Sequence, residues 1–417
     1  MKREDIEIMA PVGSFESLMA AIQGGADSVY FGIGSLNMRS RSSLNFTIDD
    51  LHKIVSIAKK HNIKTYLTLN TVMYDNDLNQ MRSYVNAAKD AGISAIIASD
   101  VAVMQYANST GIEVHLSTQL NITNYESLQF YAHFADVAVL ARELNLDQVA
   151  QMYIQITQNN ICGPGGKPIR LEMFVHGALC MAVSGKCYLS LHEMNASANR
   201  GNCMQICRKG YNVTDKDTGI ELDIDNEYIM SPKDLKTIHF LNKILDSGVR
   251  VLKIEGRARS AEYVKTTVSC YREAVEAWID DSFTEEKISD WDKRLKTVFN
   301  RGFWDGYYLG QRLGEWSANY GSEATKRRIY IGKGTNYFSK LGVAEFQMDA
   351  MDLSVGDEIL ITGPTTGVIE MTVDELRVDL EPVQTTRKGE RFSISVPEKI
   401  RRSDKLYKMV DANTIPR

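Results

Sequence analysis

The chain has 417 residues, of which 44% are hydrophobic and 24% charged, a composition typical of a globular protein and unlike that of a disordered chain. No apolar run approaches the length of a membrane span, and no apolar core of a secretory signal follows the charged start. A formal net charge of −5 gives no global attraction to a polyanion, so any nucleic-acid contact must come from local basic clusters. We therefore expect a cytoplasmic protein, not bound to a membrane, with two or three domains or one large barrel.

Eight short apolar runs alternate with helix signals in the first 254 residues. Most are continuously apolar, as is typical of strands buried on both faces. The runs are Ile6–Met9, Ser28–Phe31, Lys64–Leu69, Ala95–Ala98, Glu113–Ser117, Asp136–Leu140, Glu172–Val175 and Val249–Ile254. Eight such units predict a TIM-type (β/α)8 barrel within residues 1–325. A doubly wound open sheet is the alternative, because periodicity alone does not establish closure.

The segments between the runs carry signals for the beginnings and ends of helices. Thr47 with Asp50 resembles a capping box before Leu51, and Ser14 and Asp100 are candidate N-caps. Glycines at positions 24, 25, 92 and 111 lie where helices are expected to end.

Polar residues follow the predicted strands, and in a TIM barrel these positions lie together on the catalytic face. For any one of them, a satisfied loop group or a helix cap is the competing interpretation. The candidates in chain order are Arg39, Arg41, Asn70, Asp100, Gln119, Arg142, Glu143, His176, Glu255 and Arg257, together with Lys253 inside the last strand. Their convergence predicts a functional site at this end of the barrel.

Four of the six cysteines fall in one short segment with the spacing C-x6-C-x15-C-x3-C, at Cys180, Cys187, Cys203 and Cys207. A secreted disulfide framework would distribute its cysteines along the chain, so this density favours a metal or cluster site. Structural zinc sites usually present tight knuckles, whereas the corners of an iron-sulfur cubane suit wide and uneven spacing. The spacing therefore favours an iron-sulfur cluster, with zinc and redox-active thiols as alternatives.

The cysteines belong to a long insertion of about residues 177–230, directly after the seventh predicted strand. Loops of this length are usually functional or disordered, and cluster ligation gives this one a reason to be ordered. Ser231 and Pro232 resemble the N-cap and first position of the next helix. The sequence therefore predicts a cluster over the mouth of the barrel.

Residues 326–417 are predicted to form a small all-β barrel domain. Ile329–Ile331, Leu341–Gln347, Glu358–Thr362, Gly367–Val373 and Arg391–Val396 read as short strands separated by turn signals. A basic run at Lys399–Arg402 and Lys405 is either a solvated surface or an RNA-facing patch.

Several blocks resemble the U-class collagenase-like peptidase family of unknown mechanism. Glu172–Cys180 (EMFVHGALC) and Ser184–Ser190 (SGKCYLS) resemble its signature. The other matching blocks are Ala10–Gly13, Gly25–Asp27, Asn199–Gly201, Ser231–Leu235 and Lys253–Arg257, so the resemblance spans the predicted barrel. The C-terminal domain, with Val355–Asp357 and Gly363–Pro364, is similar to the translation-factor-like β-barrel of the longer members.

The resemblance implies an activity that differs from the family's name. Members that this chain resembles include iron-sulfur proteins that hydroxylate RNA bases or assist ubiquinone hydroxylation, among them tRNA hydroxylases that use prephenate. The likeness implies hydroxylation of the wobble uridine of tRNA, with a 4Fe-4S cluster at the four cysteines and prephenate as co-substrate. It also makes a partner subunit of the same family an expectation. Hydroxylation of a ribosomal RNA cytidine is a near alternative, but this chain has a single barrel.

Proteolysis and a non-catalytic, cluster-bearing RNA-binding role remain alternatives. No Gly-x-Ser-x-Gly elbow and no His-Glu-x-x-His helix is present. A dyad of Cys180 with His176 would use a thiolate that the cluster also needs. We therefore expect the RNA modification activity.

Roles within this hypothesis follow from chemical type. Arginines 39, 41, 142 and 257 are expected to bind carboxylates or phosphates, with Asn70, Asp100, Gln119 and Lys253 as further substrate-binding residues. His176, Glu143 and Glu255 are the candidate proton-transfer groups. Lys253 and Glu255 share one side of their strand, so an ion pair between them is the competing interpretation.

Overall fold

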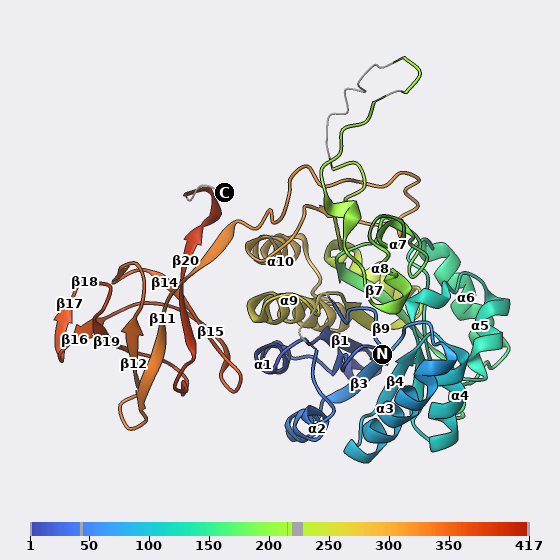
Figure 1. Cartoon of the computed structure of the whole chain (residues 1–417), viewed down its shortest axis with the longest axis horizontal. Helices are drawn as coiled ribbons and strands as arrows, with labels where there is room; N and C mark the ends of the chain where they lie inside the picture. The colour runs from blue at the N-terminus through green and yellow to red at the C-terminus, as the bar shows by residue number, and fades with distance from the viewer. Residues whose placement is uncertain (1, 42–44, 215, 219–227, 415–417) are drawn as a thin grey trace.

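The computed structural model describes residues 2–41, 45–214, 216–218 and 228–414 (Figure 1). Parts of the predicted insertion, residue 215 and residues 219–227, and the C-terminal residues 415–417 lie outside this description. None of the described helices is both long and apolar enough to cross a lipid bilayer.

Eight parallel strands form a closed barrel. The first seven pair in chain order, and β9 pairs with both β7 and β1, which closes the sheet. The strands are β1 (Glu7–Pro11), β2 (Ser28–Phe31), β3 (Lys64–Leu69), β4 (Ala95–Ala98), β5 (Glu113–Leu116), β6 (Val137–Val139), β7 (Arg170–Gly177) and β9 (Val249–Ile254). The predicted barrel is confirmed, each strand lies within two residues of its predicted bounds, and the open-sheet alternative is wrong.

Helices cover the outside of the barrel (Figure 1). They are α1 (Phe15–Gln23), α2 (Asp50–Lys60), α3 (Leu78–Ala91), α4 (Val101–Thr110), α5 (Tyr125–Ala132), α6 (Leu146–Gln158), α8 (Leu241–Asp246), α9 (Ala261–Ile279) and α10 (Glu285–Thr297). In α2, buried Leu51, Ile54, Val55 and Ala58 recur at helical spacing, so one face packs on the sheet. The predicted caps at Ser14 and Asp100 are confirmed, because both side chains accept backbone N–H bonds, and glycines 24, 92 and 111 end α1, α3 and α4. Asp50 accepts from the Thr47 N–H as predicted, but Asp49 and not Thr47 is the N-cap of α2.

Apolar side chains fill the barrel on both sides of the sheet. The outward faces of the strands pack against the helices in one large core. The inward faces contribute a smaller cluster: Met9, Tyr30, Tyr66, Ala95, Ile97, Val137 and Val251. The barrel is therefore packed inside, and open space lies at its ends.

The insertion after β7 contains α7 (Leu189–Met194) and two single turns, η4 (Ala198–Arg200) and η5 (Ile206–Arg208). It returns as β8 (Asp234–Lys236), which pairs antiparallel with the end of β7 and parallel with β10 (Phe303–Trp304). The prediction that a helix begins at Ser231 is wrong. Ser231 accepts a hydrogen bond from Arg208, and the Asp234 N–H donates to Gly302, so tertiary contacts draw this backbone into a sheet edge.

Residues from Lys326 onward form the predicted all-β region. Eight strands form one antiparallel sheet in the order β15-β14-β20-β11-β12-β19-β16-β17, with β13 and β18 paired separately. Their bounds are β11 (Lys326–Phe338), β12 (Val343–Met348), β13 (Leu353–Ser354), β14 (Glu358–Gly363), β15 (Gly367–Thr372), β16 (Leu376–Val378), β17 (Glu381–Val383), β18 (Thr385–Thr386), β19 (Arg391–Ser395) and β20 (Lys405–Asp411). A core that includes Ile331, Phe346, Phe392 and Leu406 holds the region together. The boundary between residues 325 and 326 stays a prediction.

The β region docks against α1 and α9 of the barrel (Figure 1). The Gln23 amide donates to the Thr366 carbonyl at 3.1 Å and accepts from the Val368 N–H at 2.9 Å. Lys265 on α9 donates to the Val368 carbonyl. A Cβ at Gly367, which has a φ of 71°, would lie 2.4 Å from the Gln23 oxygen, so glycine permits this close approach.

Candidate active site

A cavity of about 80 Å³ lies at the carboxyl ends of the barrel strands. Side chains from several strands and from the loops after them line it, as the topology of a TIM barrel requires. They include Tyr30, Arg39, Thr68, Asn70, Gln119, Arg142, Phe174, Lys253, Glu255 and Arg257. Seven of the predicted site residues therefore meet here, and we call this space the mouth cavity.

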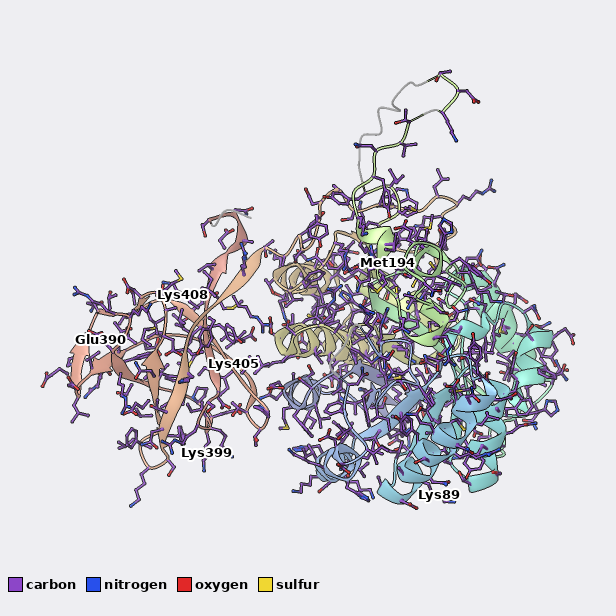
Figure 2. All side chains as sticks on the ribbon, viewed as in Figure 1. Lys89, Met194, Glu390, Lys399, Lys405 and Lys408 are labelled. Atoms are coloured by element: carbon purple, nitrogen blue, oxygen red, sulfur yellow. The ribbon has the colours of Figure 1, made fainter. Side chains whose placement is uncertain are left out.

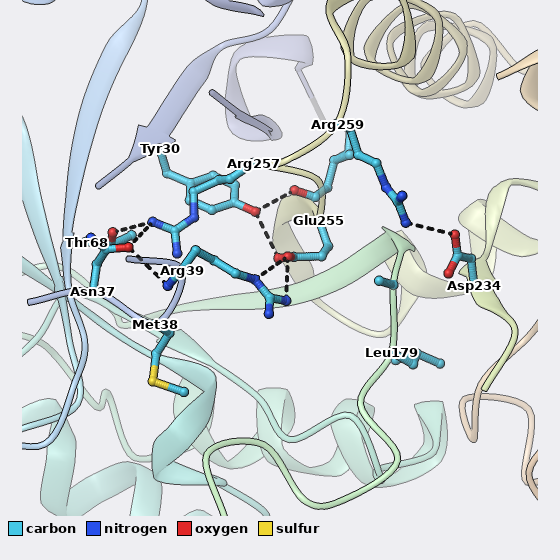
Figure 3. Close-up of polar contacts among 12 residues, drawn as sticks. Tyr30, Asn37, Met38, Arg39, Thr68, Leu179, Asp234, Glu255, Arg257 and Arg259 are labelled. Carbon is cyan, nitrogen blue, oxygen red and sulfur yellow. Dashed lines mark hydrogen bonds and ion pairs between the residues drawn. The ribbon is translucent and has the colours of Figure 1, made fainter. Parts of the chain in front are cut away.

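Glu255 is the centre of the polar contacts at the mouth (Figure 3). Its Oε1 accepts hydrogen bonds from Arg39 Nε and Nη2 at 3.2 and 2.9 Å, and its Oε2 accepts one from the Tyr30 hydroxyl at 3.2 Å. Burial raises the pKa of Glu255, but Arg39, Arg142 and Arg257 outweigh it and lower the pKa to about 2. The carboxylate is therefore ionised at neutral pH and orients the Arg39 guanidinium.

Arg257 lies beside this pair and is 5% exposed (Figure 3). Its Nη1 donates to Thr68 Oγ1 at 2.8 Å and to Asn37 Oδ1 at 3.2 Å, while its buried Nε has no partner among the described residues (Figure 3). Burial lowers the pKa of Arg257 to about 10, so the guanidinium stays charged at neutral pH. Its fixed position suits it to bind an anion.

Lys253 forms a buried ion pair with Glu172 across β9 and β7, with Nζ 2.6 Å from Oε1. The Lys253 side chain is 5% exposed, and Glu172 is fully buried. The predicted competing pair of Lys253 with Glu255 is wrong, because each group has a different partner. Since Lys253 also lines the mouth cavity, its charge contributes to the field there.

Two predicted amides, Asn70 and Gln119, lie together in the lining of the mouth cavity. Asn70 Nδ2 donates to Ser117 Oγ at 3.0 Å and to Gln119 Oε1 at 3.4 Å, and Asn70 Oδ1 accepts from the Met38 N–H. The Ser117 hydroxyl also donates to Gln119. This chain of hydrogen bonds fixes neutral polar groups in the lining of the cavity.

Arg142 reaches the cavity from the loop after β6. Its Nη1 donates to the Ala178 carbonyl at 3.1 Å, its guanidinium lies 3.9 Å from the centre of the Phe174 ring, and its buried Nε has no partner among the described residues. The next residue, Glu143, is exposed and lines a smaller cavity beside Arg142 and Cys180. Arg142 thus faces the mouth, while Glu143 lies at its edge.

The mouth carries more positive than negative charge. Four cations, Arg39, Arg142, Lys253 and Arg257, line it, and the carboxylates near them are Glu255 and Glu172. Four minus two leaves an excess of two positive charges. Burying such an excess is costly unless an anion compensates it, so the mouth is suited to a small anionic ligand.

His176 lies away from the mouth cavity. The β7–β9 pairing shifts register between Phe174 and His176, and the imidazole packs among the rings of Tyr263, Tyr271 and Phe303. Burial, followed by the charges of Lys236 and Arg259, lowers the pKa of His176 to about 3. His176 is therefore a neutral, buried side chain that faces α9.

The remaining two predicted residues also lie outside the mouth cavity. Asp100 caps α4 through the Ala102 N–H, and its other oxygen accepts from the Met73 N–H. Arg41 is exposed. The competing interpretation of Asp100 as a helix cap accounts for its contacts.

All four cysteines of the insertion line a second cavity of about 160 Å³, which we call the cysteine cavity. Their thiols are free, Cys180 is exposed and the other three are half-buried. Met38, Arg39 and Glu255 line both this cavity and the mouth cavity, as does Cys180. Among the described residues, no three His, Cys, Asp or Glu side chains form a group that could hold a single metal ion.

Three arginines that the sequence did not single out also line the cysteine cavity. Arg208 donates to the Leu179 carbonyl at 2.7 Å, the Pro232 carbonyl at 2.6 Å and Ser231 Oγ at 2.9 Å, so it ties both ends of the insertion together. Arg259 and Arg301 face the buried carboxylate of Asp234. Arg208 directly follows Cys207 in the sequence, and this proximity could have indicated that it lies near the cysteines. The positions of Arg259 and Arg301 depend on the fold.

A larger groove of about 630 Å³ lies between the barrel and the β region. Lys326, Arg327 and Arg328 on β11 line one side, and Arg259 lines the other. Ion pairs of Lys326 with Glu358 and of Arg328 with Glu262 partly neutralise it. Because Ala258 and Arg259 also line the cysteine cavity, we regard the groove as adjacent to it.

Comparison with known proteins establishes the family. Residues 13–318 match the sequence profile of peptidase family U32. The chain belongs to this family. A U32 relative named collagenase from Porphyromonas gingivalis is 66% identical over 408 residues, which cover 98% of this chain and 99% of that protein.

Other relatives of this U32 chain are named for RNA hydroxylation. The tRNA hydroxylation protein P1 of Bacillus subtilis is 33% identical, over 88% of this chain and 87% of its own length. The 23S rRNA 5-hydroxycytidine C2501 synthase of Escherichia coli is 32% identical over 74% of this chain, which spans 46% of that longer protein. Relatives of this chain are thus named as enzymes of two different classes.

Proposed function

We propose that this protein is an iron-sulfur-dependent RNA hydroxylase that modifies the wobble uridine of tRNA with prephenate as co-substrate. The observation that carries the proposal is the shared wall of the two cavities: Arg39, Glu255 and Cys180 border both the four-cysteine space and the anion-suited mouth. Relatives named for tRNA and rRNA hydroxylation support it.

The four thiols suit a 4Fe-4S cluster in number and chemical type. Thiolates are the ligands that such clusters prefer, and all four cysteines face one cavity. The wide, uneven spacing C-x6-C-x15-C-x3-C suits separated iron corners better than one zinc ion, the alternative. Cys180, Cys187, Cys203 and Cys207 would hold the cluster, which supplies one-electron chemistry when bound.

The mouth suits a small dicarboxylate. Prephenate carries two carboxylates, and the mouth has an excess of two positive charges. Arg142 and Arg257 both line the mouth cavity, and guanidinium forks match carboxylates in geometry. We assign Arg39, Arg142 and Arg257 to binding this co-substrate.

Glu255 serves chiefly to hold Arg39 in position. A carboxylate whose pKa is about 2 is a weak proton acceptor, but it is a strong hydrogen-bond partner for a guanidinium. The Tyr30 hydroxyl, which donates both to Glu255 and to the Ile254 carbonyl, fixes the carboxylate from the other side. Loss of the Glu255 charge should therefore displace Arg39 from the mouth.

The groove between the barrel and the β region is the proposed path of the RNA. Its cations are drawn from both domains, and it borders the cysteine cavity at Arg259. The predicted basic run that includes Lys399 and Lys405 also lies on the β region (Figure 2), and its role as an RNA-facing patch stays a prediction. Phosphate contacts by the groove cations would position the RNA, with the target base entering the mouth.

Proteolysis is the second candidate, because the collagenase relative is 66% identical to this chain. A Cys180–His176 dyad does not explain it, since the His176 ring packs among three aromatic rings next to α9. We therefore place hydroxylation first.

Nucleoside analysis tests the two functions together. Anaerobically purified protein is incubated with unmodified tRNA, prephenate and a reductant, and the nucleosides are analysed by mass spectrometry. We expect uridine to gain one oxygen atom. If dioxygen is the source, the reductant supplies two electrons and the second oxygen atom leaves as water; if water is the source, an added two-electron acceptor takes up the electrons, and labelled dioxygen and labelled water distinguish the two routes. If protein with a fully loaded cluster leaves the tRNA unmodified and the same sample cleaves gelatin, the order of the two candidates is reversed.

A further inference from the structure

The wall of the cysteine cavity is rich in arginine. Arg39, Arg208, Arg259 and Arg301 line it, and the carboxylates in contact with them are Glu255 and Asp234. Four positive charges minus two negative charges leave two positive charges around the cavity. A partly buried cationic excess of this kind is unfavourable until a negatively charged group occupies the space.

Asp234 is the buried carboxylate that contacts two of these arginines, Arg259 and Arg301. It is 1% exposed, its Oδ1 lies 3.4 Å from Arg301 Nη1, and its Oδ2 lies 3.6 Å from Arg259 Nη2 (Figure 3). The two guanidiniums also lie over the Phe299 ring, 3.6 Å from its centre for Arg259 and 5.1 Å for Arg301. One carboxylate and one ring thus hold two arginines in fixed positions beside the cavity.

Arg208 completes the wall from the insertion itself. Its three hydrogen bonds go to neutral acceptors, two carbonyls and one hydroxyl, so no carboxylate balances its charge in these contacts. The charge of Arg208 is therefore available to a group inside the cavity.

We infer that Arg208, Arg259 and Arg301, with Asp234 behind them, balance the negative charge of the cysteine-bound cluster and set its reduction potential. This inference rests on the proposed cluster. Four thiolates around a doubly positive core leave a loaded site with two negative charges, which match the cationic excess of the wall. One-electron reduction adds a further negative charge, so each nearby positive charge raises the potential and each nearby negative charge lowers it.

Substitutions of opposite sign test the inference on the full-length chain. Arg301→Gln and Arg259→Gln each remove a positive charge and should lower the midpoint potential. Asp234→Asn removes a negative charge with little change in shape and should raise it. Arg301→Lys retains the charge and should restore the wild-type value, and Arg377→Gln, on β16 in the β region, is a distant control that should cause no shift.

The potential is measured by anaerobic titration with dithionite, which supplies the electron, and is followed by the visible spectrum. Iron and acid-labile sulfide are measured first on each variant. Wild-type protein without a cluster after reconstitution would overturn the proposed cofactor, and this inference with it. Full clusters with equal potentials in all variants, or shifts that do not follow the sign of the charge, would overturn the inference and leave the proposed function standing.

Discussion

Substituting Glu255 by Gln tests the network at the barrel mouth. The change preserves the shape of the side chain and removes the charge that receives two hydrogen bonds from Arg39. Charge-assisted hydrogen bonds contribute about 1.5–3 kcal/mol each. Breaking a buried pair by neutralising one partner therefore costs about 3–5 kcal/mol.

The pKa of Glu255 gives a second, independent value for the stability that its ionised carboxylate contributes. A fall from 4.5 to about 2 corresponds to about 3 kcal/mol of stability at neutral pH, in agreement with the first estimate. Because the folded-state pKa lies below the unfolded-state value, this contribution is fully present above about pH 4.5 and is lost as the pH falls towards 2. The difference in stability between wild type and variant should therefore shrink below pH 4.5.

Urea unfolding at a series of pH values measures this difference, with nucleoside analysis of tRNA as the second readout. Glu375→Gln, whose exposed side chain pairs with Arg377, is the matched control and should change the free energy of unfolding by less than about 1 kcal/mol. We expect Glu255→Gln to abolish modification while iron content is retained. Unchanged stability and unchanged modification in this variant would refute the role assigned to Glu255.

Three further changes probe other parts of the structure. Lys253→Met leaves Glu172 buried without its partner and should reduce the free energy of unfolding, measured in urea, by about 3–5 kcal/mol. A Lys253→Met/Glu172→Leu double variant that is no more stable than Lys253→Met would contradict this. Arg142→Gln should raise the KM for prephenate about 10- to 100-fold with intact iron content, because one guanidinium clamp is lost; an unchanged KM would remove Arg142 from the binding site. Deletion of residues 326–417 should weaken tRNA binding more than cluster assembly, measured by filter binding and iron content, and equal tRNA affinity would argue against the groove.

The barrel was predictable because most of its strands are predominantly apolar runs, a pattern that is visible in the local sequence. The strand at Asp234–Lys236 was not, because Ser231 and Pro232 carry a helix-start signal that contacts with Arg208 and Gly302 override. Strand β20 was missed for two reasons. Its first residue, Lys405, was assigned to a basic surface run, and Lys408 interrupts the alternation of polar and apolar residues.

The candidate site was partly predictable, for a related reason. Strand ends in a TIM barrel converge by topology, so Arg39, Glu255 and Arg257 could be placed together without coordinates. His176 follows a register shift in β7 that no sequence signal marks, and it therefore turns towards α9. The partner of Lys253 comes from a neighbouring strand, which spacing within one strand does not reveal.

The most direct test of the account is the measurement of iron and acid-labile sulfide per chain, with the visible absorption spectrum, on anaerobically purified protein. The wild type is compared with Cys203→Ser, which removes one of the four thiols of the cysteine cavity. We predict one 4Fe-4S cluster per wild-type chain and loss of that cluster from the variant. A wild-type protein that binds no iron after anaerobic reconstitution would contradict the account.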